Sequence, residues 1–234
     1  MAELETTAGK RRAASRPRPD PTAFILANTR IIAVRSLTEI RLYTAHEATG
    51  LWQIAEPAAD GSDPPPPYWA FPWAGGMALA RHVLDRPEGV AGKRVLDLGA
   101  GSGLVAIAAA KAGARTVIAA EIDRYAGAAI GLNAALNGVT VTVVADDLTA
   151  GPPPSVDLVL VGDLFYEREL ALRVTTFLDR CLAAGIDVLI GDPRRAYLPY
   201  ARLSLVAEYS VPDVGEVEGA VKPAAVFALV ADAD

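Results

Sequence analysis

The sequence predicts an α/β protein: a Rossmann-like, doubly wound and mostly parallel sheet with one antiparallel strand near its end. From about residue 94, short apolar segments rich in β-branched residues alternate with helical stretches, which is typical of a parallel sheet. A glycine-rich turn joins the first segment to an alanine-rich helix. The last two apolar segments have no good helix between them, so we expect them to form a closing hairpin.

The composition fits one good-sized globular domain, since the chain has 234 residues and is 52% hydrophobic. A net charge of −6 and a pI near 5.0 disfavour binding to nucleic acid or to an anionic membrane. The single cysteine, Cys181, excludes an intrachain disulfide, and with only two histidines we expect no metal site. No apolar run approaches the ~20 residues of a membrane span, and the N-terminus lacks a signal-peptide core. We therefore expect a cytoplasmic protein, and a monomer is the default expectation for its oligomeric state.

Residues 1–20 are polar and carry a net charge of +2, from five basic and three acidic side chains. This composition predicts a disordered tail. An arginine-rich transit peptide is the alternative, which Glu3 and Glu5 weaken.

An N-terminal appendage is expected over residues 21–67, and the main domain over 68–234. Asp20 before Pro21 predicts a helix start. Two strand-like pieces follow, at Ile31–Arg35 and Glu39–Tyr43. Residues 57–67 carry five prolines and predict an extended loop.

The strands of the main domain are expected at Arg94–Leu98, Thr116–Glu121, Val139–Ala145, Val156–Asp163, Asp187–Gly191, Arg202–Val211 and Ala224–Val230. One helix is indicated by the spacing of Tyr125, Ala129, Leu132 and Leu136 before the stop signal at 137–138. Another presents Leu170, Val174, Phe177, Leu178 and Cys181 on one face. This spacing predicts that Cys181 is a core residue and not a nucleophile.

The most informative stretch runs from Val95 to Gly103 and contains D-L-G-A-G-S-G. Glycines allow a sharp turn and a close approach to a ligand, and the helix that follows offers free N–H groups, so the stretch predicts a nucleotide-like cofactor. The dinucleotide fingerprint fails because residue 104 is Leu, and the phosphate-binding Gly-Lys-Ser/Thr pattern is absent. Asp97 lies where a carboxylate could face a cationic or amino group of the ligand.

Glu121 ends the second predicted strand, where a carboxylate can accept hydrogen bonds from both hydroxyls of a ribose. The alternative is a surface acid at a strand end. Asp123 is expected to be the N-cap of the next helix.

These residues together resemble motif I and the following acidic residue of the class I S-adenosylmethionine-dependent methyltransferases. The resemblance implies the strand order 3-2-1-4-5-7-6 with strand 7 antiparallel. It implies S-adenosylmethionine as cofactor, S-adenosylhomocysteine as product, and a methionine part held by Asp97, Gly99, Gly101 and Gly103. It further implies that Glu121 holds the ribose and that Asp146 or Asp147 lies near the adenine. Gly162 and Trp73 complete the expected cofactor site, although Trp73 could instead be an aromatic core residue.

Three further segments narrow the resemblance, namely Tyr68–Gly76, Asp163–Tyr166 and Ile190–Arg194. With the Asn133…Asn137-Gly138 helix end, they resemble the seven-β-strand protein lysine methyltransferases, which carry an acid-x-x-Tyr/Phe motif after strand 4. Within that group the sequence is similar to the electron transfer flavoprotein β-subunit lysine methyltransferases, from about Phe24 to the last strand. The resemblance implies a lysine of that β-subunit as the methyl acceptor.

The reaction needs an unprotonated amine, yet lysine has a pKa near 10.4, so only roughly a few molecules in ten thousand are neutral at pH 7. We expect Asp163 to position the incoming lysine and Tyr166 to line its channel. At least one of Leu164 and Phe165 is expected to pack in the core. Arg194 and Arg195 are either surface charges or substrate contacts.

Alternative functions keep the same fold. The acceptor could be a ribosomal protein or a small nicotinamide-like amine. The chain could also be a non-catalytic binding module, which the intact Asp97, glycine turn and Glu121 disfavour. An NAD-dependent oxidoreductase is disfavoured by Leu104.

Overall fold

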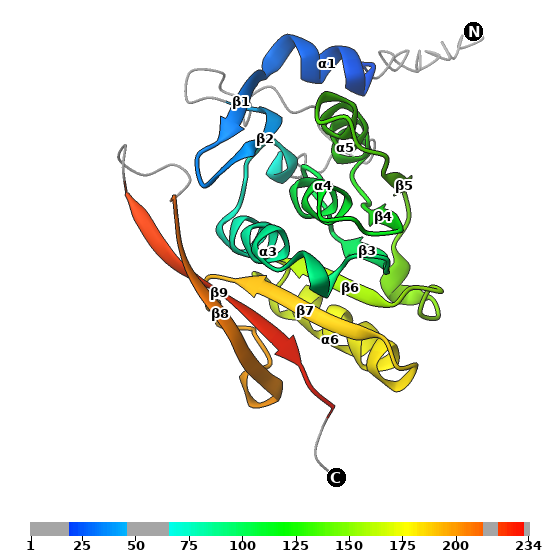
Figure 1. The fold of residues 1–234 in the computed structure, drawn as a ribbon. Helices are drawn as coiled ribbons and strands as arrows, with labels where there is room; N and C mark the ends of the chain where they lie inside the picture. The colour runs from blue at the N-terminus through cyan, green and yellow to red at the C-terminus, as the bar shows by residue number, and fades with distance from the viewer. Residues whose placement is uncertain (1–18, 46–65, 213–219, 232–234) are drawn as a thin grey trace, which may run out of the picture.

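The computed structural model describes residues 19–45, 66–212 and 220–231, and Figure 1 shows the arrangement of the chain. Residues 1–18 of the tail expected over residues 1–20, and residues 57–65 of the proline-rich loop, lie outside the described residues. Within the described ranges, no helix combines the length and apolarity needed to cross a membrane. Those same ranges contain no group of three side chains suited to hold a metal ion.

A seven-stranded sheet forms the centre of the molecule, in the order β5-β4-β3-β6-β7-β9-β8. Its strands are β3 (Arg94–Leu98), β4 (Thr116–Ala120), β5 (Thr142–Val144), β6 (Leu158–Gly162), β7 (Asp187–Asp192), β8 (Leu203–Pro212) and β9 (Val221–Leu229). Neighbouring strands from β5 to β7 pair in parallel, whereas β9 runs antiparallel to both β7 and β8. The predicted strand order and the antiparallel closing strand are therefore confirmed.

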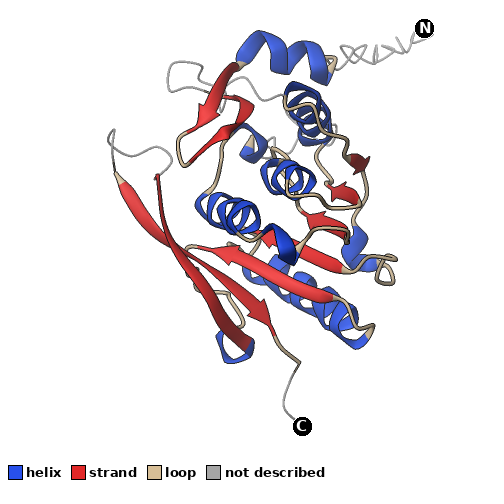
Figure 2. Cartoon of the chain, in the orientation of Figure 1, coloured by secondary structure: helices blue, strands red, loops and turns tan. Residues whose placement is uncertain are grey.

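Helices cover both faces of this sheet, as Figures 1 and 2 show. One face carries α3 (Ala74–Asp85), α4 (Leu104–Lys111) and α5 (Arg124–Leu136), and the other carries α6 (Arg168–Ala183). Short 3-10 turns lie at Tyr68–Ala70 (η2), Pro87–Gly89 (η3), Leu148–Ala150 (η4) and Tyr200–Arg202 (η5). Each face has its own hydrophobic core. Cys181 is buried in the core under α6, as predicted, and burial raises its pKa to about 11, so the thiol stays protonated.

Helix α3 is the element that the sequence analysis does not predict. It begins Ala-Gly-Gly, and glycine disfavours helix by about 1 kcal/mol relative to alanine, so local preference argues against a helix start here. Tertiary contacts override that preference. The backbone N–H of Gly76 donates to the carboxylate of Asp163 at 2.6 Å, which supplies the capping bond that the N-cap residue Trp73 does not make.

Several strands are also shorter than predicted. β4 ends at Ala120, one residue before Glu121, and β5 covers only 142–144 of the expected 139–145. β6 ends before Asp163, whose φ of 60° is incompatible with a strand. These differences place Glu121 and Asp163 just beyond the carboxyl ends of their strands.

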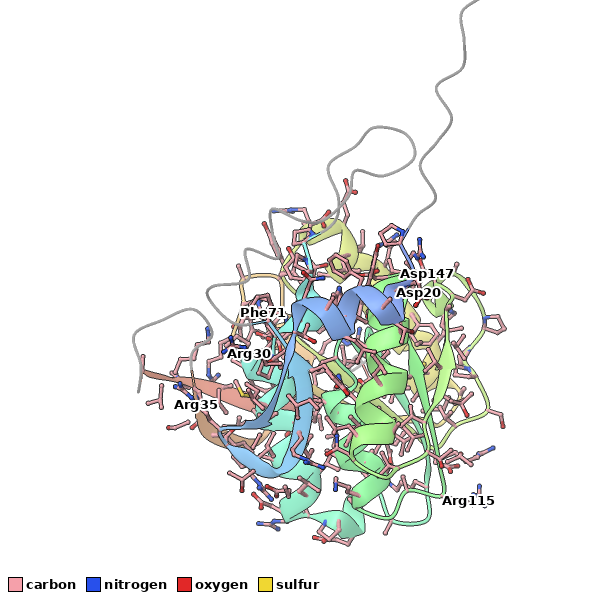
Figure 3. All side chains as sticks on the ribbon, turned by 90° about the horizontal axis from the view of Figure 1, so that it is seen from above. Asp20, Arg30, Arg35, Phe71, Arg115 and Asp147 are labelled. Carbon is pink, nitrogen blue, oxygen red and sulfur yellow. The ribbon has the colours of Figure 1, made fainter. Side chains whose placement is uncertain are left out.

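The appendage consists of α1 (Pro21–Asn28) and a hairpin of β1 (Arg30–Val34) and β2 (Leu37–Thr44). Asp20, labelled in Figure 3, caps α1 by accepting a hydrogen bond from the N–H of Ala23 at 2.9 Å, as predicted. Asn137 fastens the hairpin to the main domain through both backbone groups of Arg41. Helix α1 and strand β2 therefore both pack against α5.

Candidate active site

A cavity of about 430 Å³ opens at the carboxyl ends of β3, β4 and β6. This is the edge of a parallel sheet at which α/β proteins bind their ligands, and the volume suits a small molecule. One part of the wall consists of glycines and acidic residues, namely Gly99, Gly101, Glu121, Asp146 and Asp147. Another part carries aromatic and charged groups from Tyr68, Trp73, Asp163, Tyr166 and Arg195.

The glycine turn between β3 and α4 shapes the floor of this cavity. Gly99, Gly101 and Gly103 all have positive φ, at 66°, 52° and 79°. A Cβ on Gly99 would lie 2.6 Å from Leu164, so a larger residue cannot replace it without movement. Gly99 and Gly101 line the cavity, whereas Gly103 packs against Ile130 of α5. The first two glycines lie where a ligand can approach the backbone, and Gly103 instead allows close packing.

Asp97 lies within β3 and is 1% exposed. Its Oδ2 accepts a hydrogen bond from the N–H of Ala106 in the first turn of α4 at 2.9 Å. Burial raises its pKa to about 7, and the nearby charge of Glu121 acts in the same direction. The lining of the cavity includes the neighbouring residues Leu98 and Gly99 but not Asp97. Its expected role toward the methionine part stays a prediction.

Glu121 is held in the cavity wall by three backbone donors. Its Oε2 accepts from Gly101 at 2.9 Å, and its Oε1 accepts from Ile122 at 2.8 Å and Asp123 at 3.1 Å. Burial raises its pKa despite these hydrogen bonds. The carboxylate is thus a fixed acceptor and not a mobile surface acid. Asp123 caps α5 through the N–H of Tyr125, as predicted.

The two acids after β5 have different surroundings. Asp147 accepts from both the N–H and the hydroxyl of Thr149, at 2.9 and 2.5 Å, and its pKa is lowered mainly by that hydroxyl. Asp146 is exposed and accepts from the N–H of Asp147 at 2.8 Å. Both line the cavity, but the carboxylate of Asp147 already caps η4.

Three aromatic side chains form what we call the aromatic rim, made of Tyr68, Trp73 and Tyr166. The rings of Tyr68 and Trp73 lie 5.7 Å apart, and those of Tyr68 and Tyr166 lie 5.5 Å apart. Trp73 Nε1 donates to the carbonyl oxygen of Tyr68 at 2.8 Å, which fixes the indole. Tyr68 and Tyr166 remain 41% and 44% exposed, so the rim faces both the cavity and solvent. Next to Tyr166, Phe165 is fully buried in the core, as predicted for at least one of its pair.

Asp163 makes more contacts than the sequence indicated. Its Oδ2 accepts from the N–H of Gly76, and its Oδ1 accepts from Nη1 of Arg195 at 2.5 Å. The same Nη1 donates to Asp192 at 3.0 Å, and Asp192 is completely buried. Arg195 lines the cavity, so it is neither a free surface charge nor remote from the site. The sequence left this residue undecided because its partners lie at the ends of two different strands.

Sequence reasoning also missed two structural supports of the site. Asn133 is fully buried on α5 and joins two segments: its Oδ1 accepts from Tyr43 in β2, and its Nδ2 donates to the carbonyl oxygen of Ser102 in the glycine turn. Gly75 and Gly191 let α3 approach β7 closely, since a Cβ on either would lie 2.2 Å from the other's carbonyl oxygen. The glycine that ends the predicted strand Asp187–Gly191 is the signal that could have revealed this approach.

Several known proteins are similar to this chain. A family model described as ribosomal protein L11 methyltransferase (PrmA) matches residues 80–162. An electron transfer flavoprotein beta subunit lysine methyltransferase from Rattus norvegicus is 37% identical and covers 82% of this chain and 76% of its own. The protein of that name from Xenopus laevis is 40% identical, over 82% and 80%. A solved structure of ribosomal protein L11 methylase from Lactobacillus delbrueckii subsp. bulgaricus is 25% identical with a TM-score of 0.48, covering 65% of this chain and 77% of that one.

The strand order, the glycine turn and the fixed acid after β4 define a class I S-adenosylmethionine-dependent methyltransferase. The class alone does not specify the acceptor. With relatives at 36–40% identity over most of its length, the chain belongs to the family of electron transfer flavoprotein β-subunit lysine methyltransferases. It is an enzyme of protein lysine methylation.

Proposed function

We propose that this enzyme methylates a lysine of the β-subunit of electron transfer flavoprotein. The observation that carries the proposal is the identity of 36–40% with vertebrate proteins named for that activity, across four-fifths of the chain. The aromatic rim supports it, since it opens to solvent and can admit a side chain that is still attached to a folded protein. An enzyme for a small amine would be expected to enclose its acceptor.

The residues present fit S-adenosylmethionine. Gly99 and Gly101 leave backbone exposed in the cavity, and Glu121 offers a carboxylate whose position is already fixed. We assign the ribose to Glu121, because a carboxylate at this strand end can accept from two adjacent hydroxyls. We assign the adenine contact to Asp146, because the carboxylate of Asp147 is already engaged in capping η4.

The cofactor supplies a methyl group on a positively charged sulfur. What this chain must supply is alignment and a neutral amine, since a protonated lysine cannot attack. The aromatic rim removes water from around the lysine and so favours the uncharged form. Asp163 lies at the end of β6 beside the rim, where its carboxylate can orient the amine. Its two present hydrogen bonds hold it in place for that role.

We further propose that the enzyme works as a monomer in the cytoplasm, without nucleic-acid or membrane partners. The acidic net charge of −6 supports this, because phosphate-rich surfaces repel such a protein. The buried position of Cys181 is compatible with a reducing compartment.

The proposal can be tested with isotope-labelled S-adenosylmethionine and a whole-cell extract from a strain that lacks the enzyme. We expect the purified protein to label one band, which mass spectrometry identifies as the flavoprotein β-subunit. Label on ribosomal protein L11 would keep the enzyme class and overturn the acceptor. Label confined to small molecules would overturn the assignment to a protein substrate.

A further inference from the structure

A cluster of charged side chains lies at one wall of the cavity, with buried Asp163 and Asp192 around a partly exposed Arg195. Asp192 ends β7 and is 0% exposed, and Asp163 follows the neighbouring strand β6 and is 9% exposed. One atom, Nη1 of Arg195, serves both carboxylates, at 2.5 Å and 3.0 Å. Two buried carboxylates therefore share a single cation.

This arrangement is costly for the fold. Burying two carboxylates requires compensation by hydrogen bonds and a counter-ion. Asp163 also has a left-handed backbone with a φ of 60°, which is uncommon for a residue other than glycine. Strain and buried charge concentrate at functional sites, and this cluster lies in the cavity wall.

Arg195 is itself held firmly. Its backbone N–H donates to Oδ1 of Asp192 at 2.7 Å, and the hydroxyl of Tyr200 donates to its carbonyl oxygen at 3.3 Å. Although burial acts in the opposite direction, the neighbouring Asp163 and Asp192 raise the pKa of Arg195, so it remains a cation. Asp192 and Arg195 thus hold each other in place, and Nη1 of Arg195 in turn fixes the side chain of Asp163.

The contact continues from Asp163 into helix α3. The second carboxylate oxygen accepts from Gly76 in the first turn, and the N-cap residue of this helix is Trp73, a member of the aromatic rim. The orientation of Asp163 is therefore linked to Arg195 on one side and to the start of α3 on the other. Without Arg195, the Asp163 carboxylate would keep its hydrogen bond to Gly76 of α3 but lose the one to the guanidinium. The neighbouring carboxylate of Asp192 would also lose its positively charged partner.

We propose that Arg195 is a positioning residue for methyl transfer, which holds the carboxylate of Asp163 in a fixed orientation toward the acceptor amine. This inference rests on the proposed role of Asp163 and adds a residue that acts through it. Because a single nitrogen of Arg195 serves both carboxylates, the charge matters more than the two-pronged shape of the guanidinium. A lysine at this position is therefore expected to restore much of the function.

The test compares Arg195→Gln with Arg195→Lys, and uses Arg194→Gln as the matched control. Arg194 is the adjacent arginine, and its guanidinium pairs with the exposed Glu208 instead of with the two buried carboxylates. For Arg195→Gln we expect kcat to fall about 10- to 100-fold while the Kd for S-adenosylmethionine stays near the wild-type value. Arg195→Lys should recover most of the loss, and Arg194→Gln should match the wild type.

A double variant separates positioning from general support. If Arg195 acts through Asp163, then Arg195→Gln combined with Asp163→Asn is no slower than Asp163→Asn alone. Three results would each overturn the inference. The first is a double variant whose loss of rate is the product of the two single losses. The others are wild-type activity in Arg195→Gln and no recovery of activity in Arg195→Lys. Failure of the acceptor assignment would look different, because the wild type itself would then transfer no methyl group to the flavoprotein, and the same series would be run on whichever protein it labels.

Discussion

Asp97 is a buried carboxyl that should make the fold less stable as the pH rises. The pKa of this group is about 7 in the folded protein, against an ordinary value of 3.8. Between these values the folded state holds a proton that the unfolded state has lost. Stability is therefore highest at low pH as far as this group is concerned, and falls as the pH rises through that window.

The size of the effect follows from the difference of about three pKa units, at about 1.4 kcal/mol for each unit. Ionised Asp97 accordingly costs the fold an order of 4 kcal/mol above about pH 7, before any relaxation of its surroundings. In Asp97→Asn this cost is absent, since the amide carries no charge and its oxygen can still accept from Ala106. The variant should be more stable than the wild type, by a margin that grows with pH.

Urea unfolding at several pH values between about 5.5 and 8.5 measures this margin, which should widen by about 2 kcal/mol over the range and level off above about pH 7. Glu88→Gln is the control, because it makes the same change from carboxylate to amide at an exposed position. A margin for Asp97→Asn that does not change with pH would refute the reasoning. The same variant should bind S-adenosylmethionine more weakly, as expected where a destabilising group serves function.

Three further variants test the supports of the site. Glu121→Gln can no longer accept from three backbone donors, so its affinity for S-adenosylmethionine in calorimetric titration should fall about 10-fold; unchanged affinity would contradict the ribose assignment. Asn133→Asp cannot donate to the carbonyl oxygen of Ser102, and urea unfolding should show a loss of about 2 kcal/mol, whereas an unchanged midpoint would show that this bond is dispensable. Gly191→Ala forces a methyl group to within 2.2 Å of a backbone oxygen of α3 and should cost about 3 kcal/mol by the same measurement. Gly89→Ala, with nothing within 4 Å, is its control and should leave stability nearly unchanged.

The sheet was predictable because its signals are local. Alternating apolar strands and helices, a glycine turn at Gly99–Gly103 and a helix-free interval before the last strand are each visible in a short window of sequence. The cap residues Asp20 and Asp123 were predictable for the same reason, since each bonds within three residues of itself.

What the sequence could not reveal depends on contacts between distant segments. Helix α3 has two glycines in its first turn, and Asp163, 87 residues away from Gly76, caps that turn by accepting a hydrogen bond from it. Arg195 has its role because two strand ends lie side by side, and Asn133 because α5 lies between the hairpin and the glycine turn. No local pattern specifies which of many polar residues will meet across the fold.

The central claim is that this enzyme transfers methyl groups to a lysine of the electron transfer flavoprotein β-subunit. The most direct measurement is mass spectrometry of the purified flavoprotein from a strain that lacks the enzyme, after incubation with this protein and S-adenosylmethionine. We predict methyl-lysine on the β-subunit in the complete reaction and none when either the enzyme or the cofactor is omitted. An unmodified β-subunit, in a reaction where the enzyme demonstrably binds the cofactor, would contradict the claim.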